Sequence, residues 1–191
     1  MTYLPDIDDP DGIGRPKHSK PDLFQAVRVG LLAAFFAFLW QWTTVTYNYR
    51  GEWSALFYTG STSRLPADLD FEQTYTIARS PGYDGQFYHL IAHDPFLTRG
   101  FDRHVDNPRL RWRRILLPFL AWLFCFGNDE GTDAGLFGVT LGFVALGAAW
   151  LALYCASFGL DASWGLLFLV VPGTLVSLDR MTVDVVLYCG I

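Results

Sequence analysis

Residues 134–158 read AGLFGVTLGFVALGAAWLALYCASF, and this stretch decides the class of the protein. It carries no charged side chain, and it exceeds the roughly 20 residues that an α-helix needs to cross the hydrocarbon core of a bilayer. Its repeated glycines and alanines would let other helices pack closely against it. We therefore expect a transmembrane helix here, within an all-α membrane protein.

The composition of the whole chain agrees with a bilayer as its solvent. Of the 191 residues, 51% are hydrophobic and only 17% are charged. Arg180 is the one basic residue after Arg114, so the C-terminal part is too apolar for an ordinary water-facing surface. A pI near 5.2 without a basic fold signature argues against nucleic acid as a partner. The cysteines at 125, 155 and 189 lie in apolar runs, which favours buried small side chains over disulfides.

Further apolar runs predict a multi-pass protein. The expected spans cover about 26–47, 112–127, 134–158 and 164–178, and another begins at about 185. Residues 1–22 form a polar tail, and 23–191 form a single membrane domain. Basic residues before the first span and aromatic residues after it favour a cytoplasmic N-terminus in a cell-membrane protein, but the nine basic residues of the following loop compete with them and leave the orientation open. The last run stops after a few residues, so we expect the sequence to be part of a longer protein.

A long first loop, residues 48–111, separates the first two spans. Residues 48–114 hold eight of the nineteen acidic and nine of the fourteen basic residues, together with recurrent aromatic ones. Long loops of this kind are usually functional or disordered, and the aromatic content argues against disorder. We expect short amphipathic helices at about 70–79 and 85–93, lying on the membrane surface.

Asp84 is the strongest candidate for catalysis. It lies in YDGQFY, residues 83–88, after a Pro-Gly pair, where it could cap the following helix. It could also act as a general base that deprotonates an acceptor hydroxyl, and a capping role would hold the carboxylate in place for this chemistry. Gln86 and Tyr88 would then bind substrate beside it.

Four arginines precede the second expected span, at positions 109, 111, 113 and 114. Guanidinium groups match phosphate oxygens in geometry, so Arg109, Arg111, Arg113 and Arg114 would bind a phosphate or pyrophosphate at the membrane edge. Interfacial anchoring, or binding of anionic lipid headgroups, explains the same residues without a substrate.

Two further features are compatible with a site. His89 and His93 are four residues apart, with Asp94 adjacent, and such a pair could hold a divalent cation. Two histidines on the polar face of a surface helix are nevertheless commoner than a metal site. Asp184 begins the last apolar run and could line a cavity within the membrane, although charges between apolar runs usually form a solvated turn or, as for Asp179 and Arg180, a local pair.

The order of these features resembles the GT-C class of membrane glycosyltransferases, and most closely the PIG-V-like mannosyltransferases and their bacterial relatives in cell-surface glycopolymer formation. The segments that carry the resemblance are Tyr83–Ala92, Arg114–Trp122 and Pro172–Asp184. It implies a polyprenyl-phosphate sugar donor, with Asp84 as the catalytic acid of the first outer loop and Asp184 as a second acid that shapes the site. The histidines are not part of the family pattern, and DRMTVD stands where the family has a Y-T-E-S-like stretch.

The sequence therefore predicts a transferase that moves a sugar from a polyprenyl-phosphate donor to a glycan or glycolipid acceptor. A non-catalytic membrane subunit that binds glycolipid or phospholipid during cell-envelope polysaccharide assembly is the alternative. That subunit would need the arginines and the aromatic loop but not Asp84. A small transporter is disfavoured, because polar residues are sparse within the expected spans.

Overall fold

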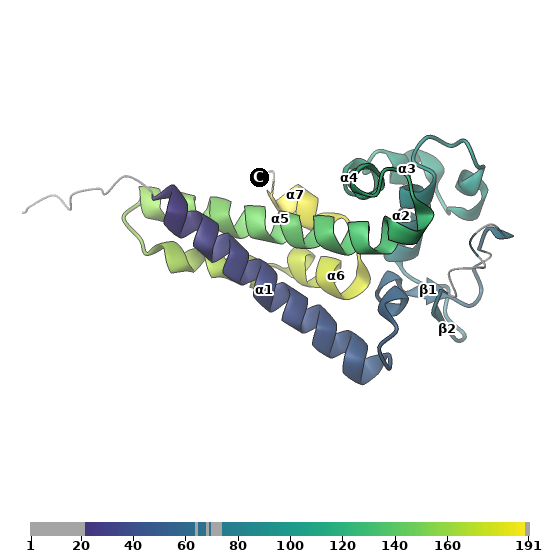
Figure 1. The fold of residues 1–191 in the computed structure, drawn as a ribbon, viewed down its shortest axis with the longest axis horizontal. Coiled ribbons are helices and arrows are strands. Elements are labelled where there is room, and N and C mark those ends of the chain that lie inside the picture. Colours follow the sequence, from purple (N-terminus) through teal and green to yellow (C-terminus); the bar gives the residue numbers. More distant parts are fainter. Residues whose placement is uncertain (1–21, 64, 68, 70–73, 190–191) are drawn as a thin grey trace, which may run out of the picture.

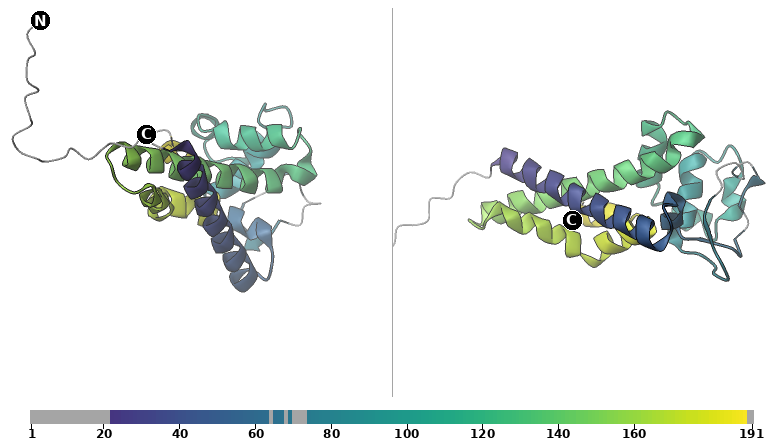
Figure 2. Two further views of the ribbon diagram at one scale, coloured as in Figure 1. Left: turned by 60° about the vertical axis from the view of Figure 1, so that its left-hand side comes forward. Right: turned by 60° about the horizontal axis from the view of Figure 1, so that its bottom comes forward.

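The computed structural model describes residues 22–63, 65–67, 69 and 74–189, and these residues are mostly helical. Two long helices, α1 (Leu23–Asn48) and α5 (Asp129–Ser157), pack side by side along the length of the molecule (Figure 1). They run in opposite directions, so α1 ends near the point where α5 begins. Both are long and apolar enough to cross a membrane. The segment between them gathers at this end, which we call the loop end (Figure 2).

Helix α1 turns small residues toward the protein and large apolar ones away from it. Its buried face includes Ala26, Gly30, Ala33 and Ala37. A Cβ at Gly30 would overlap the carbonyl oxygen of Ala145 on α5, so the two backbones approach closely. Small residues at helix interfaces and large ones outside are the pattern of membrane helices. The expected span at 26–47 corresponds to this helix.

Helix α5 begins earlier than the expected span at 134–158. The side chain of Asn128 accepts a hydrogen bond from the backbone N–H of Glu130 (3.2 Å) and caps the helix. Asp129 and Glu130 then occupy the first turn, where negative charge is favoured by the helix dipole. The polar residues 128–133, which the sequence assigns to a break, thus extend the helix into the loop end.

Residues 112–127 do not form the single membrane span expected from the sequence. The chain here forms two short helices, α3 (Pro108–Trp112) and α4 (Leu116–Phe124). Nine residues of α4 extend only about 14 Å, less than half the thickness of the hydrocarbon core. The helix cannot continue past Cys125, because Phe126 and Gly127 both adopt positive φ angles.

The expected span at 164–178 is broken in the middle. A 3-10 helix, η4 (Ala162–Val170), meets α6 (Pro172–Arg180) at an angle of 58°. Pro172 starts α6 and holds Val171 in an extended conformation, which separates the two helices. The pair can form a third crossing only as one bent unit. Helix α7 (Asp184–Cys189) follows after a turn at Met181.

The loop end contains the remaining short elements: the 3-10 helices η1 (Trp53–Phe57) and η3 (Phe101–His104), the parallel strands β1 (Thr59–Gly60) and β2 (Thr76–Ile77), and helix α2 (Asp84–His93). The helix expected at 85–93 is thus present in α2. It does not lie on a surface, however, because eight of its ten residues are buried. Of the helix expected at 70–79, residues 70–73 lie outside the described residues, and Thr76 and Ile77 form a strand instead.

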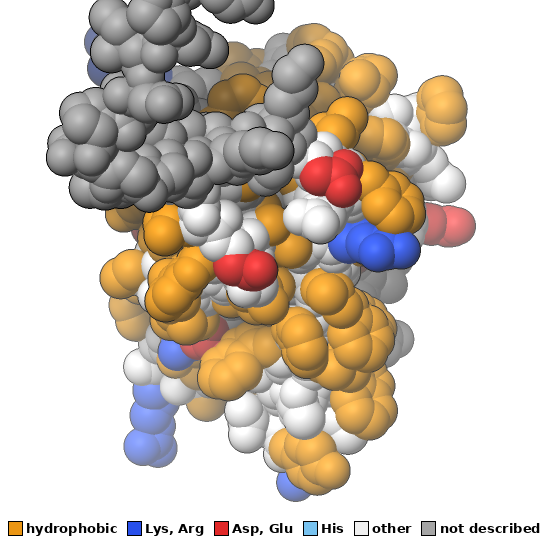
Figure 3. Space-filling view, turned by 90° about the vertical axis from the view of Figure 1, so that its left-hand side faces the viewer, with side chains coloured by type: hydrophobic (Ala, Val, Ile, Leu, Met, Phe, Trp, Pro, Cys, Tyr) orange, Lys and Arg blue, Asp and Glu red, His pale blue; other side chains and the backbone are white. Residues whose placement is uncertain are grey.

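Large apolar side chains remain exposed along the long helices and at the end opposite the loop end. Seen from that opposite end, hydrophobic side chains dominate the visible surface (Figure 3). Leu23, Phe24, Phe158 and Leu160 are each more than half exposed there. Soluble proteins rarely expose continuous apolar surface of this extent. Together with the two span-length helices, this surface indicates that the protein associates with a membrane.

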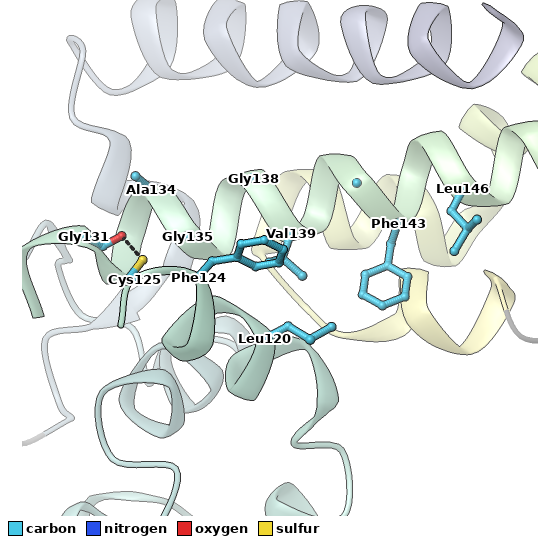
Figure 4. Close-up of a pocket in the computed structure, with 11 residues that line it drawn as sticks. Leu120, Phe124, Cys125, Gly131, Ala134, Gly135, Gly138, Val139, Phe143 and Leu146 are labelled. Carbon is cyan, nitrogen blue, oxygen red and sulfur yellow. Dashed lines mark hydrogen bonds between the residues drawn. The ribbon is translucent and has the colours of Figure 1, made fainter. Parts of the chain in front are cut away.

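An apolar groove of about 670 Å³ runs between α4 and α5 (Figure 4). Leu120 and Phe124 line one side, and Val139 and Phe143 the other. The glycines of α5 divide into two groups here. A Cβ at Gly147 would overlap the ring of Phe168, whereas Cβ atoms at Gly138 and Gly142 would meet nothing within 4 Å. Only some of the glycines therefore serve the close helix packing expected from the sequence.

Candidate functional site

Helix α2 presents two separate groups of polar side chains at the loop end. Successive residues of an α-helix are about 100° apart around its axis, so Asp84 and His89 point about 140° away from each other. Asp84 lies on the side of α2 that meets α3, and the histidines face the start of α5. The two groups are therefore described separately.

Asp84 occupies the first turn of α2, but it does not cap the helix. The N-cap position belongs to Tyr83, which makes no side-chain capping bond, so the expected capping role of Asp84 is wrong. Instead the Asp84 carboxylate accepts two hydrogen bonds from Arg111, at 2.5 Å from Nη1 and 2.8 Å from Nη2. The Asp84 side chain is 41% exposed, so substrate could still reach this carboxylate.

Arg111 lies between two carboxylates. It also donates to Asp106, at 3.0 Å from Nε and 2.9 Å from Nη2, and its guanidinium lies 4.9 Å from the centre of the Phe87 ring. The hydrogen bonds to Asp106 and Asp84 raise the pKa of Arg111 above its usual value despite burial. The same hydrogen bonds from Arg111 hold the pKa of the Asp106 carboxyl below its usual value.

The four expected arginines do not act as a single cluster. Arg111 is buried, with its side chain only 9% exposed, whereas Arg109, Arg113 and Arg114 are exposed on and after α3. A helix of five residues turns neighbouring side chains in different directions, which separates Arg111 from the others. Only Arg111 therefore belongs to the Asp84 group.

Gln86 and Tyr88 were expected to bind substrate, and both are buried. The Gln86 side chain accepts a hydrogen bond from the N–H of Gly60 (3.2 Å) and donates one to the carbonyl of Pro81 (2.9 Å). It thereby joins β1 to the turn before α2. The ring of Tyr88 lies beneath Arg111, with 5.7 Å between the guanidinium carbon and the ring centre. Tyr88 therefore supports Arg111, whereas Gln86 fastens the turn that precedes Asp84.

A groove of about 560 Å³ lies next to the start of α2, where the loop-facing ends of α1 and α6 meet. Three aromatic rings line it, those of Trp40, Tyr58 and Tyr83. Tyr58 lies in the left-handed region of backbone conformation, with φ of 54°, and its ring packs under the guanidinium of Arg180 at 3.7 Å. The groove therefore combines aromatic rings with the ion pair of Asp179 and Arg180. We refer to it as the Arg180 groove.

Arg180 lines the groove with a side chain that is 30% exposed. Its Nε bonds Asp179 at 3.1 Å, which confirms the local pair expected from the sequence, but its Nη1 is buried and has no hydrogen-bond partner among the described residues. The carbonyl of Arg180 also fits directly over Gly85, where a Cβ would overlap it, so α6 ends against the start of α2.

Asp184 lies at the turn between α6 and α7. Its carboxylate accepts a hydrogen bond from the Thr182 hydroxyl (2.8 Å), which lies 3.2 Å from the Ser177 hydroxyl. Ser177 in turn accepts from the N–H of Val185 (2.9 Å). Asp184 thus belongs to a hydrogen-bonded turn. This turn adjoins α2 only through the end of α6, so Asp184 is not brought into contact with Asp84.

The two histidines meet a pair of carboxylates from α5. His89 Nε2 lies 2.7 Å from an oxygen of Asp133, and His93 Nδ1 lies 2.8 Å from an oxygen of Asp129. The Nε2 atoms of the two histidines are only 3.2 Å apart. The ligand atoms of His89, His93 and Asp133 all lie within 4.8 Å of one another. We call these three residues the His–Asp cluster.

The surroundings of the His–Asp cluster favour the neutral form of His93 and hold both imidazole rings in place. Burial, and next the neighbouring His89, lower the pKa of His93 to about 4. The His89 ring stacks on Phe57, with 4.1 Å between ring centres. Arg99 Nη1 bonds both oxygens of Asp129 at 2.8 and 2.9 Å, which holds this carboxylate against His93.

Asp94, the third metal candidate from the sequence, has a different role. Its carboxylate accepts hydrogen bonds from the backbone N–H groups of Thr98 (2.7 Å), Arg99 (2.9 Å) and Phe101 (3.3 Å). It therefore organises the turn after α2 and does not join the histidines.

Sequence reasoning missed Asp106, Asp129, Asp133 and Arg180 as site residues. A signal existed for the acids of α5, because Asn128 followed by acidic residues is typical of a helix start, and Asp129 and Asp133 share the four-residue spacing of His89 and His93. Comparisons with models of known protein families, with curated proteins and with solved structures gave no match.

Proposed function

We propose that this protein is a multi-pass membrane glycosyltransferase, or the part of one that the sequence covers, which transfers a sugar from a polyprenyl-phosphate donor to a glycan or glycolipid acceptor. The observation that carries the proposal is the Arg180 groove, where three aromatic rings and a guanidinium adjoin the helix that carries Asp84. The resemblance of Tyr83–Ala92 to the GT-C motif supports the same function.

Each end of the donor has a complementary partner in the groove. The partly exposed guanidinium of Arg180 suits a phosphate oxygen, since guanidinium groups form strong charge-assisted bonds with phosphate. Aromatic faces such as those of Trp40 and Tyr83 suit the apolar face of a sugar ring. The groove lies beside the apolar surfaces of α1 and α6, where a polyprenyl chain would remain in lipid.

Asp84 is the proposed general base. In the transfer, Asp84 accepts the proton of the acceptor hydroxyl, the acceptor oxygen bonds to the anomeric carbon, and the bond from that carbon to the phosphate oxygen breaks. The negative charge that stays on the polyprenyl phosphate is stabilised by Arg180. Arg111 orients the carboxylate of Asp84, and Asp106 balances part of the charge of Arg111.

The proposed topology has α1 and α5 crossing the membrane, with η4 and α6 as a third, bent crossing. The N-terminus lies in the cytoplasm, so the loop end with Asp84 lies on the outer side. Polyprenyl-linked donors would then reach the Arg180 groove along the outer leaflet.

The test is a transfer assay in membranes that contain the full chain, with a panel of radiolabelled polyprenyl-phosphate sugars and an extract of cell-envelope glycans as acceptor. Asp84→Asn is expected to lower the rate of transfer by about 100-fold or more, as for the loss of a general base. Arg180→Gln is expected to raise KM for the donor by about tenfold to a hundredfold, because one charged hydrogen bond is lost.

Asp106→Asn is the matched control for Asp84. Both carboxylates bind Arg111, so a merely structural effect through Arg111 would appear in both variants. We expect Asp106→Asn to retain most of the transfer activity. Equal losses in the two variants, or transfer that survives Asp84→Asn, would remove Asp84 from the chemistry.

One observation favours the alternative, a non-catalytic subunit that binds glycolipid or phospholipid. Arg111 already occupies both oxygens of Asp84, so an acceptor hydroxyl would have to displace one of these hydrogen bonds. If the wild-type chain transfers no sugar from any donor, yet binds vesicles that contain polyprenyl phosphate through Arg180, the subunit function replaces the transferase.

A further inference from the structure

The His–Asp cluster lies apart from the Asp84 group and plays no part in the proposed transfer. It joins two segments that are distant in sequence, the end of α2 and the first turns of α5. The ligand atoms of its three residues lie within 4.8 Å of one another. The pattern of the membrane glycosyltransferases does not include the two histidines. The resemblance to that class therefore assigns no role to the His–Asp cluster.

We propose that His89, His93 and Asp133 bind a divalent transition-metal ion, best matched by zinc, which fastens α2 to the start of α5. Two imidazole nitrogens and one carboxylate oxygen are a common protein ligand set for zinc, with a fourth position left for water. Imidazole ligands select transition metals over Mg²⁺ and Ca²⁺, which prefer oxygen.

One distance fits a small tetrahedral ion directly, and the others require the Asp133 side chain to move. Zinc bonds nitrogen and oxygen at about 2.0–2.2 Å, so ligand atoms of a tetrahedral site lie about 3.3 Å apart. The two Nε2 atoms are 3.2 Å apart, close to this value. Asp133 lies nearer to His89, at 2.7 Å, and has to retreat by about half an ångström. Its side chain is 34% exposed, so it has room to do so.

The hydrogen bonds around the cluster prepare His93 for this role. A carboxylate only accepts hydrogen bonds, so His93 Nδ1 donates its proton to Asp129 and its Nε2 presents a lone pair toward His89. The order of carboxylate, histidine and metal is the usual outer shell of zinc sites, and it fixes the tautomer of the ligand. Arg99 completes the shell, because it holds Asp129 through both oxygens.

Access to the fourth position is available only from one side. The histidine side chains are essentially buried, at 1% and 0% exposure. Asp133, in contrast, lines a groove that it shares with Glu130 and Trp53. Water would complete the coordination from that groove. Three protein ligands with one open position are the pattern of catalytic rather than closed structural zinc sites, so the ion would tie the loop end to α5 while it keeps one exchangeable water.

The test is a metal titration of the full chain in detergent, purified without a polyhistidine tag and stripped with a chelator. Isothermal titration with zinc chloride is expected to give one ion per chain with a dissociation constant below 1 μM, and magnesium chloride no saturable binding. Cobalt(II) is expected to give the visible absorption of a tetrahedral site. A wild-type chain that binds no zinc above the level of buffer would overturn the proposal.

Variants identify the ligands. His93→Gln and Asp133→Asn are expected to weaken zinc binding by at least 100-fold, and Asp129→Asn by 10–100-fold as an outer-shell residue. His104→Gln, a histidine of η3 outside the cluster, is the matched control and should bind as the wild type does.

Circular dichroism identifies any variant that fails to fold, and the wild-type titration is independent of the variants. Zinc binding that survives the double change His89→Gln and His93→Gln would also overturn the proposal. None of these measurements depends on sugar transfer, so failure of the metal site and failure of the transferase proposal are distinguishable.

Discussion

At the scale of residues, Arg111 is the central charged group of the Asp84 side of α2. It is buried, it serves two carboxylates, and it lies over two aromatic rings. The sequence predicted Asp84 and Arg111 as site residues, but it did not pair them, because 27 residues separate them along the chain. The sequence also predicted that Gln86 and Tyr88 bind substrate, but both side chains are buried. Local spacing alone does not show which face of a short helix the rest of the protein covers.

The pairing of Asp106 with Arg111 predicts a pH dependence. The folded protein lowers the pKa of Asp106, so on acidification below about pH 4 the unfolded chain takes up this proton first, and stability falls as the pH drops. Thermal unfolding in detergent from pH 6 to pH 3 should show a smaller acid-induced loss for Asp106→Asn than for the wild type. If the melting temperatures of the two proteins fell in parallel with pH, the lowered pKa of Asp106 would be contradicted.

The hydrogen bonds of Gln86 predict that its substitution lowers the stability of the protein, independently of any catalytic role. In the variant Gln86→Leu, the buried N–H of Gly60 loses its acceptor, which costs about 1–3 kcal/mol, whereas the carbonyl of Pro81 still accepts from the Ser63 hydroxyl at 3.3 Å. The melting temperature should fall by several degrees. Gln25→Leu, at an exposed position of α1, is the control and should melt with the wild type.

At the scale of elements, the two long helices could be predicted from hydrophobic length alone. The shorter ones could not, because their limits depend on a few backbone conformations. Positive φ angles at Phe126 and Gly127 stop helix α4 from continuing, and Pro172 separates η4 from α6. The apolar composition of these segments matches a span equally well, so hydropathy does not distinguish a short or broken helix from a complete crossing.

The packing of α1 on α5 predicts that substitutions of the glycines in these two helices change stability in opposite directions. Gly30→Ala introduces a Cβ that overlaps the backbone of Ala145, so the helices must move apart, and the variant should lose about 1–3 kcal/mol of stability. Gly138→Ala has free space and gains helix propensity, up to about 1 kcal/mol. Thermal unfolding of both variants in the same detergent gives the comparison, and equal effects would contradict the close approach at Gly30.

At the scale of the whole molecule, polar chemistry gathers at one end of a long apolar body. The carboxylates of α5 reach this end only because the helix begins at Asp129, before the apolar run. This is why the sequence predicted the histidines without their partners. A contact between residues 44 positions apart, such as that of His89 with Asp133, depends on how α2 docks on α5, which no local pattern encodes.

The proposed topology predicts opposite labelling of the two ends. In a chain whose native cysteines are replaced by alanine, Thr62→Cys and Arg103→Cys at the loop end should react with a membrane-impermeant maleimide in intact cells. Asp161→Cys, at the start of η4, should react only after permeabilisation. The reverse pattern would contradict the orientation, and equal labelling of all three positions would contradict a spanning arrangement.

Tyr58 reveals a conflict between folding and function at a single position. A residue other than glycine in the left-handed conformation carries a backbone penalty of about 1–2 kcal/mol, which glycine would avoid. Yet glycine would also delete the ring beneath Arg180, and with it one wall of the groove. Laboratory evolution for heat resistance alone would therefore favour the change Tyr58→Gly, whereas simultaneous selection for ligand capture would retain the aromatic ring.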